Sequence, residues 1–144
     1  MKYVFIAVEG ETEEELYKNH ILPYIKKLLN KQEYGVKFKV HNVRGVGGFK
    51  NDSIMKFKEI ISKNPDCDEF IVSLCYDTDV FENSFNLPID WEKVDDKMKK
   101  AGADRVIHIK AKKSIEDWLL YALKDICKWL RINVPSNLHG KSGV

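Results

Sequence analysis

The chain has 144 residues, of which 44% are hydrophobic, so it can bury the core of one domain without stabilising cross-links. Its 24 Lys and Arg nearly balance its 22 Asp and Glu, so a net charge of +2 gives no argument for attraction of nucleic acid by the whole surface. Any basic footprint must therefore be local.

The cysteines and the apolar runs indicate the compartment. Cys67, Cys75 and Cys127 form an odd set without CxxC spacing, which is typical of a reducing environment. The first apolar run meets acidic residues too early for a signal peptide, and no run approaches the ~18 residues of a membrane span. We therefore expect a soluble cytoplasmic protein without membrane contact.

The first third of the chain predicts a strand, a turn and a helix. Residues 3–8 are an apolar run, which indicates a buried strand, and a Glu-Gly pair follows as a tight turn. Apolar residues at helical spacing continue to Leu29 and predict a long helix. Pro23 has no N–H to donate, so we expect a kink or break near residues 20–22.

The middle of the chain predicts an edge strand and a second helix. Residues 36–43 alternate between apolar and polar side chains, as in a half-buried strand near the edge of a sheet. The glycine-rich segment 44–50 matches no nucleotide-binding motif, and a flexible loop is expected there. Asn51 or Asp52 can then cap a helix that runs through residues 54–61.

The last part of the chain repeats the strand and helix pattern. Residues 70–76 are almost wholly apolar, which indicates a central strand covered on both faces. An irregular loop over 80–90, a polar helix over 91–101 and a strand over 105–109 follow. Ser114 would open a final helix.

Alternating strands and helices predict the α/β class, with a mainly parallel four-stranded sheet in the order 2-1-3-4 and helices on both faces. We expect one domain over residues 1–132. Residues 133–144 contain no closing element, so they are interpreted either as a flexible tail or as a truncated one, in which case the natural chain extends beyond Val144.

Acidic residues follow the predicted strands at the edge where such sheets bind ligands. Glu9 ends the first strand, and Asp77 and Asp79 end the third. In the order 2-1-3-4 these strands are neighbours about 4.8 Å apart, so three carboxylates would face one crevice. Clustered negative charge requires cations or raised pKa values, and oxygen ligands favour Mg²⁺ or Mn²⁺.

Two further carboxylates are candidates, each with a structural alternative. Glu13 lies one helical turn after Glu9 and would complete a metal shell, although acidic residues in a first turn also stabilise the helix dipole. Glu116 lies just after the fourth strand, next to a capping box formed by Ser114 and Asp117 that does not require it. The preceding lysines, Lys113 among them, would neutralise a phosphate or be simply solvated.

Two of these segments resemble motifs of the Toprim family. Val8-Glu9-Gly10-Glu11-Thr12-Glu13-Glu14 is similar to its first motif, a strand that ends in Glu-Gly, and to the EGxTE form of small stand-alone Toprim proteins and OLD-type nucleases. Tyr76-Asp77-Thr78-Asp79 is similar to its second motif, DxD after a strand. The resemblance extends from Lys2 to about Leu120, but the glycine that often follows DxD is replaced by Val80-Phe81-Glu82.

The resemblance implies a Rossmann-like Toprim fold and a metal-dependent nuclease, or a related phosphoryl-transfer enzyme, that acts on DNA or RNA. Glu9 would act in acid or base chemistry, and Asp77 and Asp79 would bind Mg²⁺. Glu13 and Glu116 would complete a two-metal site with Glu9, and Gly10 and Lys113 would contact phosphate. A protein partner from the same system is also expected.

Two alternatives remain open at this point. One is a non-catalytic module that binds metal or nucleic acid through an incomplete Toprim site. The other is a haloacid-dehalogenase-type phosphatase that uses Asp77 as a covalent acceptor, although that motif usually lies on the first strand and would leave Glu9 without a role.

Overall fold

The computed structural model describes residues 1–30, 35–77 and 89–111, together with residues 126, 128 and 130. Within these ranges the chain forms a four-stranded, wholly parallel sheet in the order β2-β1-β3-β4. The predicted α/β class and strand order are therefore confirmed. The strands are β1 (Lys2–Val8), β2 (Val36–Asn42), β3 (Glu69–Asp77) and β4 (Arg105–Ala111).

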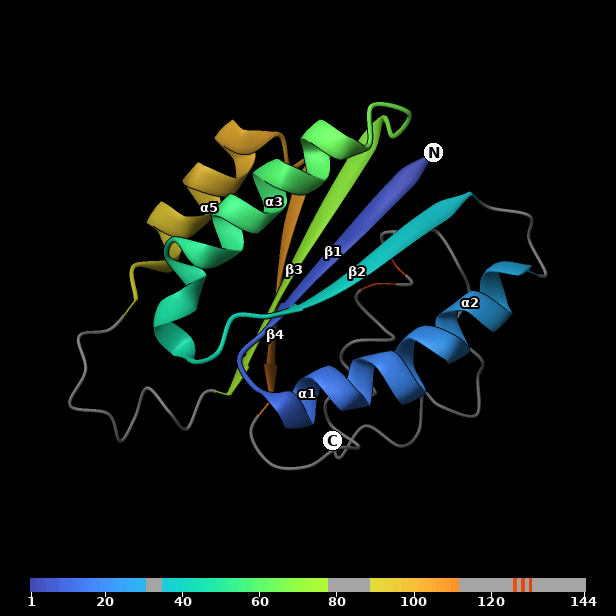
Figure 1. Cartoon of the computed structure of the whole chain (residues 1–144), viewed down its shortest axis with the longest axis horizontal. Helices are drawn as coiled ribbons and strands as arrows, with labels where there is room; N and C mark the ends of the chain where they lie inside the picture. Colours follow the sequence, from blue (N-terminus) through green and yellow to red (C-terminus); the bar gives the residue numbers. More distant parts are fainter. Residues whose placement is uncertain (31–34, 78–88, 112–125, 127, 129, 131–144) are drawn as a thin grey trace.

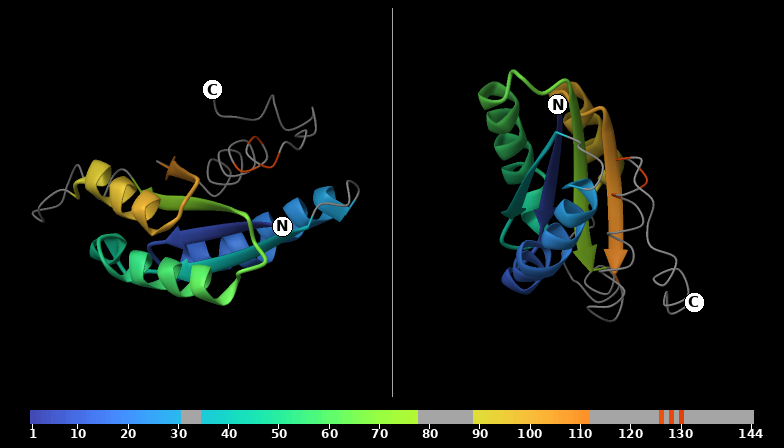
Figure 2. Two further views of the ribbon diagram at one scale, coloured as in Figure 1. Left: turned by 90° about the horizontal axis from the view of Figure 1, so that it is seen from above. Right: turned by 90° about the vertical axis from the view of Figure 1, so that its right-hand side faces the viewer.

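The register brings the carboxyl ends of the strands to one edge of the sheet. Val8 at the end of β1 pairs with Asn42 of β2 on one side and with Cys75 of β3 on the other. Asp77 at the end of β3 pairs with Ala111 at the end of β4. The arrowheads of β3 and β4 point the same way in Figure 2. We call this side of the sheet the carboxyl edge.

The central strands are apolar because both of their faces are covered. In β1 every residue from Tyr3 to Val8 is buried, and β3 is buried from Phe70 to Tyr76. Side chains alternate between the two faces, so each strand contributes to two cores. β2 lies at the edge, as predicted, and most of its residues are only half-buried.

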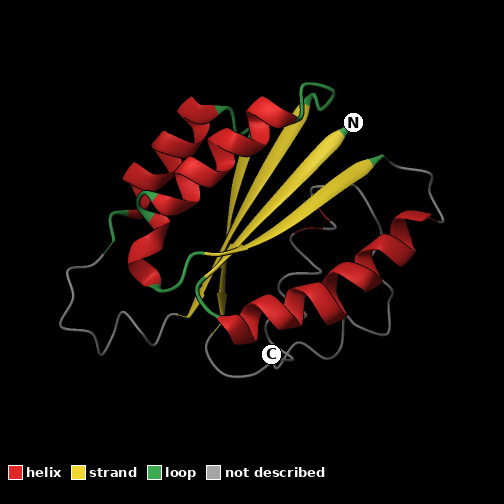
Figure 3. Ribbon diagram, viewed as in Figure 1, coloured by secondary structure: helices red, strands yellow, loops and turns green. Residues whose placement is uncertain are grey.

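Helices cover both faces of the sheet, also as predicted (Figures 1 and 3). One face is covered by α1 (Glu11–Leu16), the π-helical turn η1 (Tyr17–Ile21) and α2 (Leu22–Asn30). The other face is covered by the 3-10 helix η2 (Val46–Phe49), α3 (Asp52–Lys63) and α5 (Trp91–Ala101). Ile126 and Leu130 belong to the core on the α1 face.

The break expected near residues 20–22 takes the form of the π-helical turn η1. The backbone N–H of Leu22 donates to the carbonyl of Tyr17, five residues earlier, where an α-helix would use four. Pro23 follows immediately and cannot donate a backbone hydrogen bond. The wider turn keeps both Tyr17 and Ile21 fully buried against the sheet.

The flexible loop predicted for the glycine-rich segment 44–50 is wrong. Val46–Phe49 forms η2, and the Phe49 side chain is fully buried among aromatic rings. The next helix begins where the sequence predicts, but the side-chain hydrogen bond expected of its cap is not formed. Asn51 occupies the N-cap position of α3 without a side-chain hydrogen bond, and Asp52 pairs instead with His41 at 2.8 Å.

The helix α5 has the boundaries that the sequence predicts. The Asp90 carboxylate accepts a hydrogen bond from the backbone N–H of Lys93, and Gly102 ends the helix with a φ of +125°. The positive φ favours glycine there. Ile61 of α3 lies so close to Gly102 that an added Cβ would be 2.7 Å from its Cδ1. The two helices are therefore in contact.

Several expectations lie outside the described residues. These are the loop over residues 80–88, the helix expected from Ser114 with its capping box, and the tail over 133–144. Among the described segments, none of the helices combines the length and apolar character needed to cross a bilayer.

Candidate functional site at the carboxyl edge

The turn that follows β1 is held on both sides by main-chain hydrogen bonds. The N–H of Val43 donates to the carbonyl of Val8, and the N–H of Gly45 donates to the carbonyl of Glu9, both at 2.8 Å. The Gly10 carbonyl accepts a further bond from the first turn of α1 at 3.1 Å. Glu9 is half-buried and therefore has a defined backbone position at the carboxyl edge.

Glu13 returns over this turn from the first helix. A Cβ atom added to Gly10 would lie 2.9 Å from Oε2 of Glu13, so the absence of a side chain at Gly10 leaves room for this carboxylate. The negative charge of Glu13 also contributes to the raised pKa of Cys75, after the larger effect of burial. Its carboxylate thus lies near the ends of both β1 and β3.

Asp77 ends β3, the strand that neighbours β1. It lies two positions beyond Cys75, whose partner in β1 is Val8. The structure thus brings Glu9, Gly10 and Glu13 together at the carboxyl edge and puts the backbone of Asp77 at the end of the adjacent strand. Asp79, Lys113 and Glu116 lie outside the described residues, so their placement beside Glu9 remains a prediction.

A buried polar contact lies beneath the turn. The hydroxyl of Tyr17 and the Sγ of Cys75 are hydrogen-bonded at 2.9 Å, and the Ser73 hydroxyl lies 3.5 Å from the same sulfur. Burial raises the pKa of the Cys75 thiol to about 12, against smaller lowering effects of these two hydroxyls. The thiol is consequently protonated at neutral pH and not nucleophilic.

A second polar network, not anticipated from the sequence, lies on the other face of the sheet. Nε2 of His108 lies 2.8 and 3.0 Å from the two Asp95 oxygens, and Nδ1 lies 3.0 Å from the Tyr76 hydroxyl. A carboxylate only accepts, so Nε2 carries a proton and, in the neutral ring, Nδ1 accepts from Tyr76. The Trp91 ring stacks on Tyr76 with centroids 4.0 Å apart.

The surroundings of Tyr76 raise the pKa of its hydroxyl. Burial raises the pKa of its hydroxyl to about 12, and the nearby Asp95 charge adds to that rise. Tyr76 precedes Asp77, and strand alternation puts its ring on the face opposite Cys75. Strand alternation was the one sequence signal for this network, since it indicates the face on which Tyr76 lies. No sequence spacing links His108 to Asp95.

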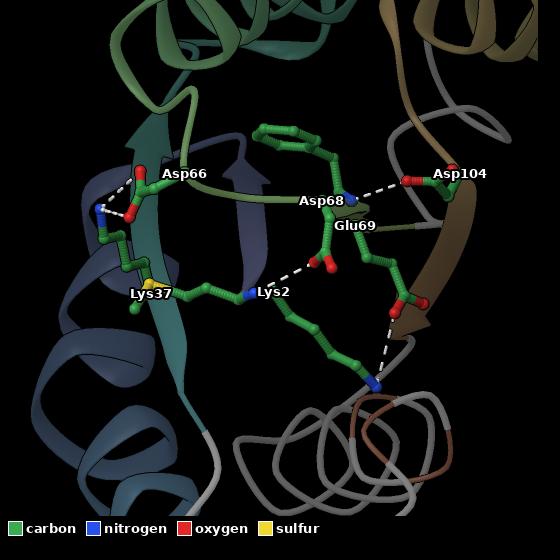
Figure 4. A network of polar contacts seen from close by, with 8 residues as sticks. Lys2, Lys37, Asp66, Asp68, Glu69 and Asp104 are labelled. Carbon is green, nitrogen blue, oxygen red and sulfur yellow. Dashed lines mark hydrogen bonds and ion pairs between the residues drawn. The ribbon is translucent and has the colours of Figure 1, made fainter.

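At the opposite edge of the sheet, the amino edge, where the strands begin, charged side chains form ion pairs with one another (Figure 4). Lys37 donates to both oxygens of Asp66, at 3.0 and 3.3 Å, and Lys2 lies 3.5 Å from Glu69. The hydrogen bond from Lys37 lowers the pKa of the Asp66 carboxyl. Charged side chains at this edge thus serve as ion-pair partners.

No group of three or more His, Cys, Asp or Glu side chains within the described ranges is arranged to hold a metal ion. Of the carboxylates expected to bind metal, the side chains of Glu9 and Glu13 belong to described residues. Such hard oxygen donors suit Mg²⁺ or Mn²⁺ better than zinc.

Fold and site define a small α/β protein with a four-stranded parallel sheet of order 2-1-3-4 and acidic residues at its carboxyl edge. Comparison of the chain with protein-family models, curated proteins and solved structures gave no significant match.

Proposed function

We propose that the protein is a metal-dependent nuclease, or a related phosphoryl-transfer enzyme, of the Toprim type. The observation that carries this proposal is the position of Glu9 at the end of β1 and of Asp77 at the end of the adjacent β3. Ligands of open α/β sheets bind at this edge. The position of Glu13 beside Gly10 supports the same site.

Each acidic residue has a role in this mechanism. Asp77 and Asp79 would hold Mg²⁺ or Mn²⁺, and Glu13 and Glu116 would complete the ligand set of a second ion. When bound there, such cations would lower the pKa of water and offset the negative charge of the leaving oxygen. Glu9 takes the proton of the water that attacks phosphorus, while the bond from phosphorus to the leaving oxygen breaks. Gly10 and Lys113 contact the phosphate.

The phosphatase alternative is less well supported. Asp77 ends the third strand of the chain, whereas the phosphatase motif usually lies on the first. That alternative also leaves Glu9 and the Glu13 carboxylate over Gly10 without a role. No observation favours it over the nuclease.

The test is cleavage of single- and double-stranded DNA and of structured RNA with Mg²⁺ and with Mn²⁺. Glu9→Gln should keep much of the metal affinity and lose about 10²- to 10⁴-fold in cleavage rate, the usual contribution of a general acid or base. Asp79→Asn should lose both metal affinity and cleavage. Glu116→Gln should cleave at a rate between that of wild type and those of these two variants. Glu15→Gln is the matched control, because Glu15 is exposed on α1 and has no role in the mechanism.

Metal binding is followed separately by thermal unfolding. Binding to the native state alone stabilises it by about 2.7 kcal/mol at a hundredfold excess of metal over Kd, which raises the melting temperature. Asp77→Asn should remove most of that rise. If wild type binds metal, cuts none of the substrates and behaves as Glu9→Gln does in every assay, the non-catalytic binding module replaces the nuclease.

A further inference from the structure

A basic groove runs between α3 and α5 on the outer surface of their layer, where the two helices lie side by side (Figure 1). It has a volume of about 440 Å³. Its floor includes Ile54 and Ala101, and Met55 at its side is 70% exposed. Its polar lining consists of Asn51 and four lysines, namely Lys50, Lys58, Lys97 and Lys100.

The charge of the groove is not neutralised by the surrounding acidic residues. No carboxylate lines it, and within the described part of the chain none of its four lysines forms an ion pair. Three acidic residues of these helices pair with groups outside the groove, whereas the exposed Glu92 and Asp96 of α5 form no ion pair within the described residues and do not line the groove. Asp52 pairs with His41, Glu59 with two other lysines of α3, and Asp95 with His108. The groove is thus a local positive surface on a chain of nearly balanced charge.

The groove begins at the same edge of the sheet as the candidate site. Lys50 directly follows η2, and the segment that leads into η2 is tied to the first turn by the bond from Gly45 N–H to the Glu9 carbonyl. Within α3, Lys58 lies about 9 Å beyond Asp52 along the helix axis, given a rise of about 1.5 Å per residue. That distance spans two to three nucleotides of one DNA strand at about 3.4 Å each.

We infer that this groove binds the phosphodiester backbone of a nucleic acid and guides the strand toward the carboxyl edge. The inference rests on the proposed function for the choice of nucleic acid over other polyanions. The described residues that line the groove include no aromatic side chain on which a base could stack. Contacts from four ammonium groups to phosphates position a strand without reading its sequence. Binding is therefore independent of sequence and sensitive to salt.

The experiment measures binding by fluorescence anisotropy in EDTA, so that no cleavage occurs. The probes are a short labelled DNA duplex of mixed sequence and its single strand. With four phosphate contacts the logarithm of the duplex binding constant should fall with a slope of about −3.6 against the logarithm of salt, a loss of roughly a hundredfold between about 50 and 200 mM. Lys97→Gln/Lys100→Gln should halve that slope and leave a loss of roughly tenfold.

A second variant and a matched control accompany this one. Lys50→Gln/Lys58→Gln should halve the slope as well. Lys26→Gln/Lys27→Gln removes the same charge from exposed positions of α2, on the other face of the sheet, and should keep the wild-type slope. Thermal unfolding of each variant verifies that it is folded.

Each result decides between the groove and its alternatives. Equal slopes for both groove variants and wild type overturn the inference, as does tighter binding of polyglutamate than of either DNA probe. Equal losses in groove and control variants would show attraction by total charge and would overturn it too. Because binding is measured in EDTA, where no cleavage occurs, a failed nuclease assay with intact groove binding counts against the proposed catalysis alone.

Discussion

At the scale of single residues, two adjacent glycines of η2 have opposite surroundings. A Cβ added to Gly48 would lie 2.2 Å from the carbonyl oxygen of Val43 and 2.7 Å from its Cβ, whereas one added to Gly47 would meet nothing within 4 Å. The close approach at Gly48 is to backbone, which cannot rotate away. It joins η2 to the chain that leaves β2.

We predict opposite outcomes for alanine at these two positions. Gly48→Ala should lower the free energy of unfolding by about 1–3 kcal/mol, as overpacking does, because Val43 must shift. Gly47→Ala should change it by less than about 0.5 kcal/mol. Urea unfolding of both variants measures the difference, and equal effects would mean that Gly48 does not pack against Val43.

At the scale of elements, the helices α5 and α3 differ in how they begin. Asp90 accepts a hydrogen bond from the N–H of Lys93 at 3.2 Å, while Asn51 makes no such bond for α3. The sequence offers a good capping residue at both places, so composition alone would rank the two caps as equal. Only the structure separates them.

We predict that Asp90→Ala lowers the free energy of unfolding by about 1 kcal/mol, since one N–H at the start of α5 loses its acceptor. Asn51→Ala should cost less than about 0.5 kcal/mol. Asp96→Ala, in the exposed middle of α5, controls for the loss of a negative charge. The comparison is by chemical denaturation, and a cost at Asn51 equal to that at Asp90 would contradict it.

Local patterns were sufficient to predict the elements because each pattern reports the environment of one segment. The apolar runs of β1 and β3 predicted central strands, and the alternation in β2 predicted an edge. Glu9 could be assigned to the carboxyl edge for the same reason. What local patterns do not contain is contact between distant segments. Tyr17 and Cys75 are 58 positions apart, and nothing in either neighbourhood indicates their hydrogen bond.

The prediction of a flexible loop over the glycine-rich segment was wrong for a related reason. Glycine is compatible both with a mobile loop and with close packing, and the choice depends on Val43, which belongs to another segment. Of the candidate site, the backbone positions of Glu9 and Asp77 and the approach of Glu13 to Gly10 agree with the proposal. Asp79, Lys113 and Glu116 lie outside the described residues.

At the scale of the whole molecule, the burial of β3 on both faces makes the free energy of unfolding depend on pH in the alkaline range. Burial raises the pKa of Cys75 from 9.0 to about 12 on one face and that of Tyr76 from 10.0 to about 12 on the other. Between these values the unfolded chain releases protons that the native state keeps. The stabilising effect is complete below the unfolded pKa values and is lost as the pH rises through the folded ones.

We therefore predict that the free energy of unfolding falls steadily from about pH 9 to about pH 12. Cys75→Ala and Tyr76→Phe should each make this decline shallower, whatever they cost at neutral pH. Ile109→Val is the control, since it should lower the whole curve by about 1 kcal/mol without changing its slope. Urea titrations across this pH range give the slopes, and unchanged slopes in both variants would contradict the prediction.

The central place of β1 also has a consequence for synthesis on the ribosome. At the amino edge, the ammonium group of Met1 pairs with Asp68, 67 positions later, and β1 obtains its β3 neighbour only when that part of the chain has emerged. At about 5–20 residues per second this takes several seconds. During that time β1, which is apolar on both faces, can pair only with β2, and its other edge has no neighbour. The nascent chain is thus most exposed to aggregation before β3 is made, and chaperone contact with β1 is of most use then.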